Sequence, residues 1–211
     1  MKSLINASKD VYESNVEDSR LIHLKNGQMV ELRAIHPEDD IKIKEMHERL
    51  SRTSLYFRYL YAYKPRLEDM QKISQRDNCS GAAFVAVLQD GLGTIIGLSN
   101  YSVNPRQPDV AEPAVIVDDN YQRQGLGGAL LNRLRLHAAA QGIQAFQAFI
   151  LPSNNRIRRL IANSGLSYKS RFNWEQGVLE VTLPLSDSVP TPSTSNIRPC
   201  PGVAPGSWCC Q

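Results

Sequence analysis

The sequence of 211 residues is poor in cysteine and shows no cluster of metal-binding side chains. Cys79 stands alone, while Cys200, Cys209 and Cys210 fall in the last dozen residues, a spacing that matches no zinc pattern. The four histidines are also far apart in the chain: His23, His36, His47 and His137. We therefore predict no metal site, and thiols that stay reduced as they do in the cytoplasm.

The sequence also lacks a long apolar run and an excess of one charge. No stretch approaches the roughly 18 apolar residues of a membrane-spanning helix, and the first residues lack the apolar centre of a signal peptide. A balance of 24 basic against 21 acidic side chains gives a net charge of +3, too small to indicate a nucleic-acid or membrane surface. We expect a cytoplasmic protein that binds neither nucleic acid nor membrane.

Composition divides the chain into one folded unit and two polar ends. Residues 186–211 contain five prolines, five serines and only two charged side chains, so they cannot bury enough apolar surface to offset the entropy of ordering. Residues 1–19 are polar and lack hydrophobic periodicity. We predict a flexible extension over 1–19, a single domain over 20–185 and a disordered tail over 186–211.

Hydrophobic patterning within the central unit predicts alternating strands and helices. Asn26 and Gly27 separate two apolar runs and predict a hairpin, since both residues tolerate positive φ. Apolar residues at helical spacing predict an amphipathic helix from Leu126 to Ala138. The other expected elements are helices near 37–50, 54–61, 67–75 and 157–161, and strands near 82–88, 94–103, 112–117, 143–151, 167–174 and 178–185. This order predicts an α/β fold with a mixed sheet.

The segment YQRQGLGGALL, residues 121–131, places three glycines in four positions between a predicted strand and a predicted helix. The unpaired N–H groups of a helix's first turn and the helix dipole bind phosphate without side chains. Gly125, Gly127 and Gly128 would let a phosphate approach that backbone. The alternative is a glycine-rich turn that only allows tight helix–strand packing. Neither the lysine-serine pair of a Walker motif nor a GxGxxG sequence is present.

A family resemblance favours the phosphate interpretation. Residues 122–127, QRQGLG, resemble the Q/R-x-x-G-x-G/A signature of the GNAT superfamily of acyl-CoA-dependent N-acyltransferases, and the predicted element order matches that fold. The resemblance covers about residues 28–185. Segments 111–131 and 50–60 are most similar to the acetyltransferase domains of bacterial Pat-type protein lysine acetyltransferases.

The resemblance implies a GNAT fold, with a mixed and mostly antiparallel sheet of about seven strands, and acetyl-CoA as co-substrate. In this family the backbone of the glycine-rich loop holds the coenzyme A pyrophosphate. Carried over to this sequence, the loop residues are Gln122, Arg123, Gln124, Gly125, Leu126, Gly127 and Gly128.

The resemblance also makes Glu112 the candidate catalytic base. Glu112 lies thirteen residues before Gly125, where Pat-type and histone-type relatives place a glutamate. A lysine ammonium titrates near pH 10.4 in water, so a base must take its proton as it attacks. The alternative is a half-exposed strand glutamate without a task.

The strand that carries Glu112 has a second expected role. Alternation predicts Glu112 on one face of the sheet and Val115 and Val117 on the other. By resemblance, the backbone amides of Val115 and Val117 contact the acetyl carbonyl and the pantetheine arm. Pro113 departs from a regular strand because it has no N–H group. It marks a bulge or shifts Glu112 out of register.

The segment after the next strand supplies a further candidate. Asn154 matches a family asparagine that contacts pantetheine, and the alternative is a helix N-cap. The tyrosine that protonates the leaving thiolate in many GNAT enzymes is replaced by Ile161, so we assign no general acid. Three arginines in this helix either contact the coenzyme's phosphates or form a solvated face: Arg156, Arg158 and Arg159. The aromatic cluster at 55–63 is interpreted as a core helix, with the border of an acceptor groove as the alternative.

These features predict an acetyl-CoA-dependent N-acetyltransferase in which an amine attacks the thioester directly in a ternary complex, since no cysteine is placed to carry an acetyl group. By resemblance the acceptor is a protein lysine ε-amine. The alternatives are a small-molecule amine as acceptor and a non-catalytic acyl-CoA-binding sensor. Glu112 separates these classes, because a sensor needs the glycine-rich loop but no base.

Overall fold

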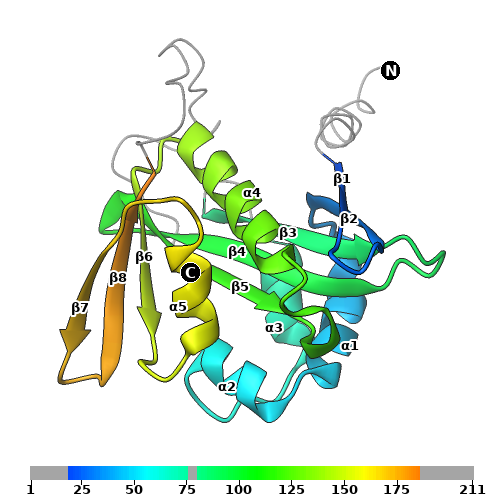
Figure 1. Ribbon diagram of the computed structural model, residues 1–211, viewed down its shortest axis with the longest axis horizontal. Coiled ribbons are helices and arrows are strands. Elements are labelled where there is room, and N and C mark those ends of the chain that lie inside the picture. The colour runs from blue at the N-terminus through cyan, green and yellow to red at the C-terminus, as the bar shows by residue number, and fades with distance from the viewer. Residues whose placement is uncertain (1–18, 76–79, 186–211) are drawn as a thin grey trace, which may run out of the picture.

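The computed structural model describes residues 19–75 and 80–185, which form one eight-stranded sheet with helices on both faces (Figure 1). The strands are β1 (Arg20–His23), β2 (Met29–Ala34), β3 (Gly81–Leu88), β4 (Ile95–Asn104), β5 (Gln107–Val117), β6 (Ala145–Ile150), β7 (Lys169–Asn173) and β8 (Val178–Pro184). Their order in the sheet is β1-β2-β3-β4-β5-β6-β8-β7. The pair β5–β6 is parallel and the other neighbouring pairs are antiparallel. The predicted mixed, mostly antiparallel sheet is confirmed, with eight strands where about seven were expected.

The helices divide between the two faces of the sheet. They are α1 (Asp40–Arg49), α2 (Arg52–Tyr59), α3 (Leu67–Ser74), α4 (Leu126–Ala140) and α5 (Asn155–Ala162), with 3-10 turns η2 (Pro37–Asp39) and η3 (Asp119–Tyr121). In Figure 1, α4 and α5 lie in front of the sheet, α1 and α3 lie behind it, and α2 lies below. None of the helices in the described ranges has the length and apolar character needed to cross a bilayer.

Alternation along the strands separates the two faces of the core. On β5, Ile116 packs with Ile43 and Met70 on the α1–α3 side. Its neighbour Val117 packs with Leu126 and Leu130 under α4. The face that carries Ile116 also carries the even-numbered Glu112, because side chains two apart share a face.

Two differences from the predicted elements have local causes. Helix α2 ends at Tyr59 instead of near 61, because Leu60 adopts the left-handed conformation with φ 64°. Strand β5 begins at Gln107, five residues before the predicted start at 112, because it pairs with β4 from its first residue, opposite Asn104. The predicted extension over 1–19, apart from Ser19, and the predicted tail over 186–211 lie outside the described residues.

Candidate active site

The sheet opens between β5 and β6. Their pairing is confined to Val110 with Ala145 and Ala111 with Phe146, although β5 continues to Val117. Beyond Ala111, β5 therefore remains paired with β4 along one edge, and its other edge borders a wedge between the two strands.

The backbone groups of alternate β5 residues point into this wedge. The Asp118 amide donates to the Ile96 carbonyl on the β4 side (2.9 Å), whereas the Asp109 carbonyl accepts from the Gln144 amide on the β6 side (2.7 Å). Successive residues of a strand direct their backbone groups to opposite edges. Odd-numbered residues of β5 therefore face the wedge, and even-numbered residues face β4.

Val115 and Val117, the predicted backbone donors, both direct their N–H groups toward the wedge by this rule. The Val117 carbonyl, which points the same way, accepts a hydrogen bond from Gln122 Nε2 (2.9 Å). Pro113 also faces the wedge, so its missing N–H group removes no hydrogen bond to β4. The β4–β5 register runs without a shift past Pro113, so neither the bulge nor the register slip considered above occurs there.

Glu112 lies on the α1–α3 face, opposite Ser102 of β4, and its side chain is exposed. It lines two cavities of about 320 and 310 Å³, and Ser102 also lines both. The first cavity is bounded by α2, α3 and the segment between them, and the second by β6 residues Gln147 and Phe149. Glu112 thus stands where an acceptor side chain could reach it from the face opposite α4.

The glycine-rich loop forms the N-terminus of α4. Gly125 is the N-cap with φ 92°, a conformation that glycine adopts without strain, and no side chain caps this end of the helix. The Gly128 and Ala129 amides donate to the Gly125 carbonyl (3.1 and 3.2 Å). The amides of Leu126 and Gly127 precede them in the first turn, where a helix leaves its N–H groups for an external acceptor. The Leu126 side chain itself is buried in the core.

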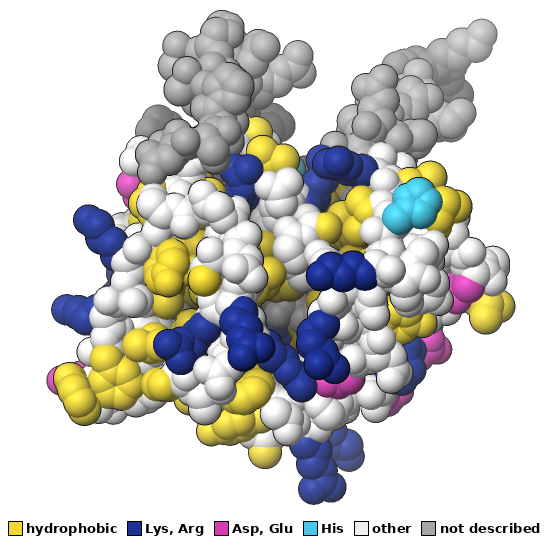
Figure 2. Space-filling model, viewed as in Figure 1, with side chains coloured by type: hydrophobic (Ala, Val, Ile, Leu, Met, Phe, Trp, Pro, Cys, Tyr) yellow, Lys and Arg dark blue, Asp and Glu magenta, His cyan; other side chains and the backbone are white. Residues whose placement is uncertain are grey.

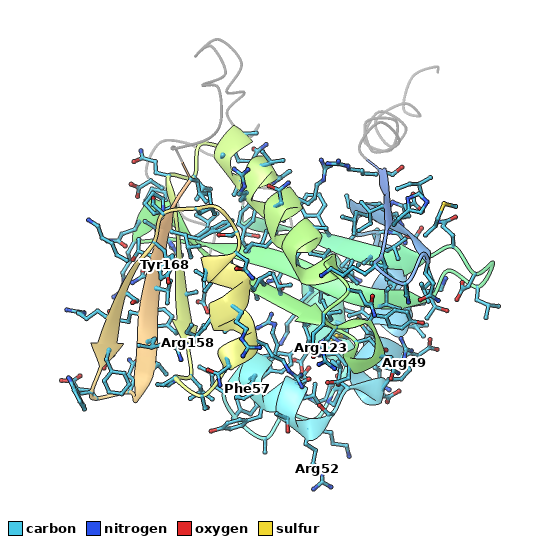
Figure 3. All side chains as sticks on the ribbon, viewed as in Figure 1. Arg49, Arg52, Phe57, Arg123, Arg158 and Tyr168 are labelled. Atoms are coloured by element: carbon cyan, nitrogen blue, oxygen red, sulfur yellow. The ribbon has the colours of Figure 1, made fainter. Side chains whose placement is uncertain are left out.

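Basic side chains surround the space in front of this loop. Figure 2 shows them gathered around a hollow in the middle of the face that carries α4 and α5. Arg123 lies on the loop and Arg158 on α5 (Figure 3), and both are exposed. Arg123 has a left-handed backbone with φ 61°, and the next residue, Gln124, accepts a hydrogen bond from the Lys25 amide of the β1–β2 hairpin (3.4 Å). The charge of Arg123 favours phosphate at the helix N-terminus, whereas Arg158 Nη1 donates to the Pro152 carbonyl (3.4 Å) and to Asn155 Oδ1 (3.3 Å).

Asp119, in η3, joins the loop to α2 and α5. Its carboxylate accepts hydrogen bonds from the Ser51 amide (2.8 Å), the Ser54 hydroxyl (2.7 Å) and Gln122 Nε2 (3.2 Å), and it lies 3.5 Å from Arg156 Nη1. Burial acts to raise the pKa of Asp119, but the hydrogen bonds from Ser51 and Ser54 outweigh it and the pKa is lowered. The side chain of Gln122 is therefore engaged by Asp119, and its Oε1 accepts a hydrogen bond from Arg156 of α5 (2.5 Å).

Asp118 makes a second connection behind the loop. This buried carboxylate accepts from Arg49 Nε of α1 (3.0 Å), while Arg49 Nη2 donates to the Ile95 carbonyl (2.8 Å). Sequence reasoning missed both aspartates as organising residues. Their adjacency to a glycine-rich turn was a signal, but their partners Arg49, Ser51 and Ser54 are 65 to 69 residues away along the chain.

Asn154 caps α5, and its Oδ1 accepts from the Ile157 amide (3.2 Å) in a buried position. The capping role is therefore present, and contact with pantetheine stays a prediction. Ile161 is buried in the core and offers no proton donor. In the two described ranges, no three His, Cys, Asp or Glu side chains gather as a metal ion would require.

The predicted site residues thus come together at one opening in the sheet. The loop residues and Asn154 lie on the α4–α5 side, the odd-numbered β5 amides line the wedge, and Glu112 lies on the opposite face. The aromatic cluster at 55–63 was interpreted as a core helix, but α2 ends at Tyr59, and Tyr61 and Tyr63 line the cavity beside Glu112, as in the alternative of a groove border. The sequence did not predict Asp69 beside them.

Comparison with known proteins identifies the family of the chain. The model of the acetyltransferase (GNAT) family matches residues 43–165, more than half of the chain. Over 175 residues the chain is 28% identical to Acetyltransferase Pat of Mycolicibacterium smegmatis, a match that covers 80% of this chain and 50% of that protein. It thus spans only half the length of that relative.

Two further comparisons cover nearly the whole of the matched protein. Acetyltransferase PA5475 of Pseudomonas aeruginosa is 28% identical over 170 residues, with 78% of this chain and 90% of that protein covered. The crystal structure of the GNAT domain of S. lividans PAT superposes with a TM-score of 0.72 at 25% identity, covering 80% of this chain and 98% of that one. The chain therefore belongs to the acetyltransferase (GNAT) family and is similar to the Pat acetyltransferases.

Proposed function

We propose that this protein transfers the acetyl group of acetyl-CoA to the ε-amine of a protein lysine, by direct attack in a ternary complex. The observation that carries the proposal is the wedge between β5 and β6, with a glycine-rich helix N-terminus on one face and Glu112 on the other. Similarity to Pat-type acetyltransferases favours lysine as the acceptor. We also propose that the protein acts in the reducing cytoplasm, as expected from the sequence.

The first-turn amides of α4 would hold the pyrophosphate of acetyl-CoA. Gly127 has no side chain to block the approach, and the exposed Arg123 of the loop adds positive charge. The pantetheine arm would pass into the wedge and meet the N–H groups of Val115 and Val117. Such amides also stabilise the oxyanion that forms on the acetyl carbonyl, and each is worth roughly 3–4 kcal/mol in comparable acyl transfers.

Glu112 would accept the proton of the attacking ammonium, directly or through a water molecule. The amine lone pair then forms a C–N bond to the thioester carbonyl carbon, the C–S bond breaks, and the coenzyme leaves as a thiolate. The second proton of the nitrogen passes to this thiolate or to water. A coenzyme thiol is acidic enough to leave without a dedicated proton donor. The buried Ile161 at the position of the usual tyrosine is therefore compatible with transfer.

An assay of acetyl transfer to different amines tests this proposal. Acetyl-CoA is supplied with lysine peptides, with small amines such as polyamines and amino acids, and with a whole-cell lysate. Free coenzyme thiol is measured with a chromogenic reagent, and acetylated products are identified by mass spectrometry.

We expect thiol release to match the formation of acetyl-lysine in peptides and lysate proteins. Transfer to small amines in preference to peptides would overturn the lysine assignment. Tight binding of acetyl-CoA without transfer to any amine would indicate an acyl-CoA sensor.

A further inference from the structure

The cavity of about 320 Å³ beside Glu112 is rich in aromatic rings. Its lining combines three tyrosines, two carboxylates and two cationic side chains: Tyr59, Tyr61, Tyr63, Asp69, Glu112, Arg58 and Lys72. Apolar side chains also line it: Met70, Ile73 and Ala114. Ligand pockets span roughly 300–1,000 Å³, so this volume fits a single side chain or a short amine.

A buried histidine fixes the first tyrosine. His47 is fully buried, and its Nδ1 lies 2.8 Å from the Ile43 carbonyl. A carbonyl can only accept, so Nδ1 carries the proton and Nε2 accepts from the Tyr59 hydroxyl (2.8 Å). Burial lowers the pKa of His47 to about 4, which keeps the ring neutral in this role. The hydrogen bond to His47 thereby fixes the position of the Tyr59 side chain.

Further contacts link Tyr59 to the residues at the rim of the cavity. The rings of Tyr59 and Tyr63 stack with centroids 3.8 Å apart, and the Tyr63 hydroxyl donates to Asp69 Oδ2 (3.1 Å). Desolvation acts to raise the pKa of Asp69, but hydrogen bonds from Tyr63 and Arg66 outweigh it and the pKa is lowered. Asp69 therefore stands at the cavity as a carboxylate, and its Oδ2 and Oδ1 atoms also pair with Arg66 Nε (3.2 Å) and Lys72 Nζ (3.9 Å).

Tyr61 is the ring left most open to a ligand. Tyr59 is already covered, because the Arg58 guanidinium lies 4.9 Å from its centroid and is held there by Asn100 (3.1 Å). Tyr61 packs at 80° to Tyr63 with centroids 5.9 Å apart, and it is 57% exposed.

We propose that this cavity binds the acceptor as an unbranched aliphatic ammonium group, with the rings of Tyr61 and Tyr63 and the carboxylate of Asp69 holding the cation beside Glu112. This assignment rests on the proposed function. Aromatic faces attract ammonium groups, and apolar walls accept the methylene stem. Tyr61, Tyr63 and Asp69 select the acceptor, while Glu112 takes its proton.

The experiment compares Tyr61→Leu with Tyr61→Phe in steady-state assays on Nα-acetyl-lysine methylamide. Leucine keeps apolar contact and loses the ring face, so we expect the KM for the amine to rise on the order of 3–10-fold. Phenylalanine keeps the ring and should leave KM unchanged. Asp69→Asn should raise KM by a similar factor. The dissociation constant of acetyl-CoA should stay the same in all three variants.

Tyr168→Leu is the matched control. Tyr168 is an exposed tyrosine (47%) just before β7 (Figure 3), and it does not line the cavity, so its loss should leave KM unchanged. A KM for Tyr61→Leu within about twofold of the parent would overturn the assignment, because even an exposed cation–π contact is worth more.

Saturation-transfer NMR separates this inference from the proposed function. We expect the parent to bind Nα-acetyl-lysine methylamide and to bind Nα-acetyl-norleucine methylamide, which lacks the ammonium group, more weakly. The preference should be lost in Tyr61→Leu. Binding with this preference but without acetyl transfer would contradict the proposed function alone. Transfer by a parent that binds both amides equally would contradict the inference alone.

Discussion

Among single residues, Gly127 separates ligand binding from folding most cleanly. A Cβ atom there would meet only Leu160, at an ordinary 3.7 Å, and the backbone does not require glycine. We expect Gly127→Glu to keep the melting temperature within a few degrees and to abolish binding of acetyl-CoA. The new side chain would cover the first-turn amides of α4, and its charge would oppose the phosphates. Isothermal titration calorimetry measures the loss.

Ala140→Glu is the control for this change. It adds the same charge to the same helix, about 20 Å away at 1.5 Å per residue, and should bind acetyl-CoA like the parent. Gly125 is a poorer position for the test, since its φ of 92° strains any other residue. Unchanged affinity in Gly127→Glu would mean that the loop is only a turn.

Among the elements, the contact between α2, the loop and α5 depends on Asp119. Asp119→Asn keeps one acceptor oxygen and turns an NH₂ group toward donors on Ser54 and Gln122. Replacing one side of such a network costs roughly 1–3 kcal/mol. We expect a lower melting temperature and about tenfold weaker binding of acetyl-CoA. Thermal unfolding and calorimetry check both effects.

Asp109→Asn provides the comparison for Asp119→Asn. It removes an exposed carboxylate at the start of β5, away from η3, and should change neither quantity. If Asp119→Asn behaves like Asp109→Asn, the hydrogen bonds around Asp119 do not position the loop.

Local patterns explain how much of these elements could be predicted. Asn26-Gly27, the alternation of β5 and the apolar stripe of α4 are local signals, and the corresponding elements are present. The left-handed conformation of Leu60 could not be predicted from the sequence, because leucine rarely adopts it. This turn of the backbone brings Tyr61 and Tyr63 to the cavity. The divergence of β5 and β6 could not be predicted from local patterns, since pairing between distant segments leaves none.

For the whole molecule, the buried His47 predicts a pH dependence of stability. Its pKa falls from 6.5 in the unfolded chain to about 4 in the fold, because burial disfavours the charged ring. The unfolded chain therefore binds more protons between these values, and the free energy of unfolding falls as the pH drops from 6.5 to 4. At 1.36 kcal/mol per pH unit the loss is on the order of 3 kcal/mol.

His47→Gln can keep both hydrogen bonds but cannot titrate. We expect its free energy of unfolding, measured in urea between pH 4.5 and 7, to fall less steeply than that of the parent. His137 also has a pKa lowered by burial, so some slope should remain in the variant. Equal slopes in parent and variant would show that His47 is not the titrating group.

Truncation of the chain tests the C-terminal boundary of the folded unit. The described chain closes with Leu185, which is 1% exposed and whose amide donates to the Gln144 carbonyl (2.8 Å). We expect a protein that ends at Leu185 to keep its melting temperature and turnover, because the composition of 186–211 supports no core. A drop of many degrees would place part of that segment within the fold.

The pH–rate profile of Glu112→Gln tests the central claim most directly. Glutamine keeps the size of Glu112 but cannot accept the proton of an amine whose ordinary pKa is about 10.4. The account predicts that turnover at pH 7 falls roughly 10²–10⁴-fold, that affinity for acetyl-CoA is unchanged, and that raising the pH partly restores turnover as more amine arrives neutral. Turnover within about threefold of the parent at pH 7 would contradict it, since general-base catalysis is worth far more.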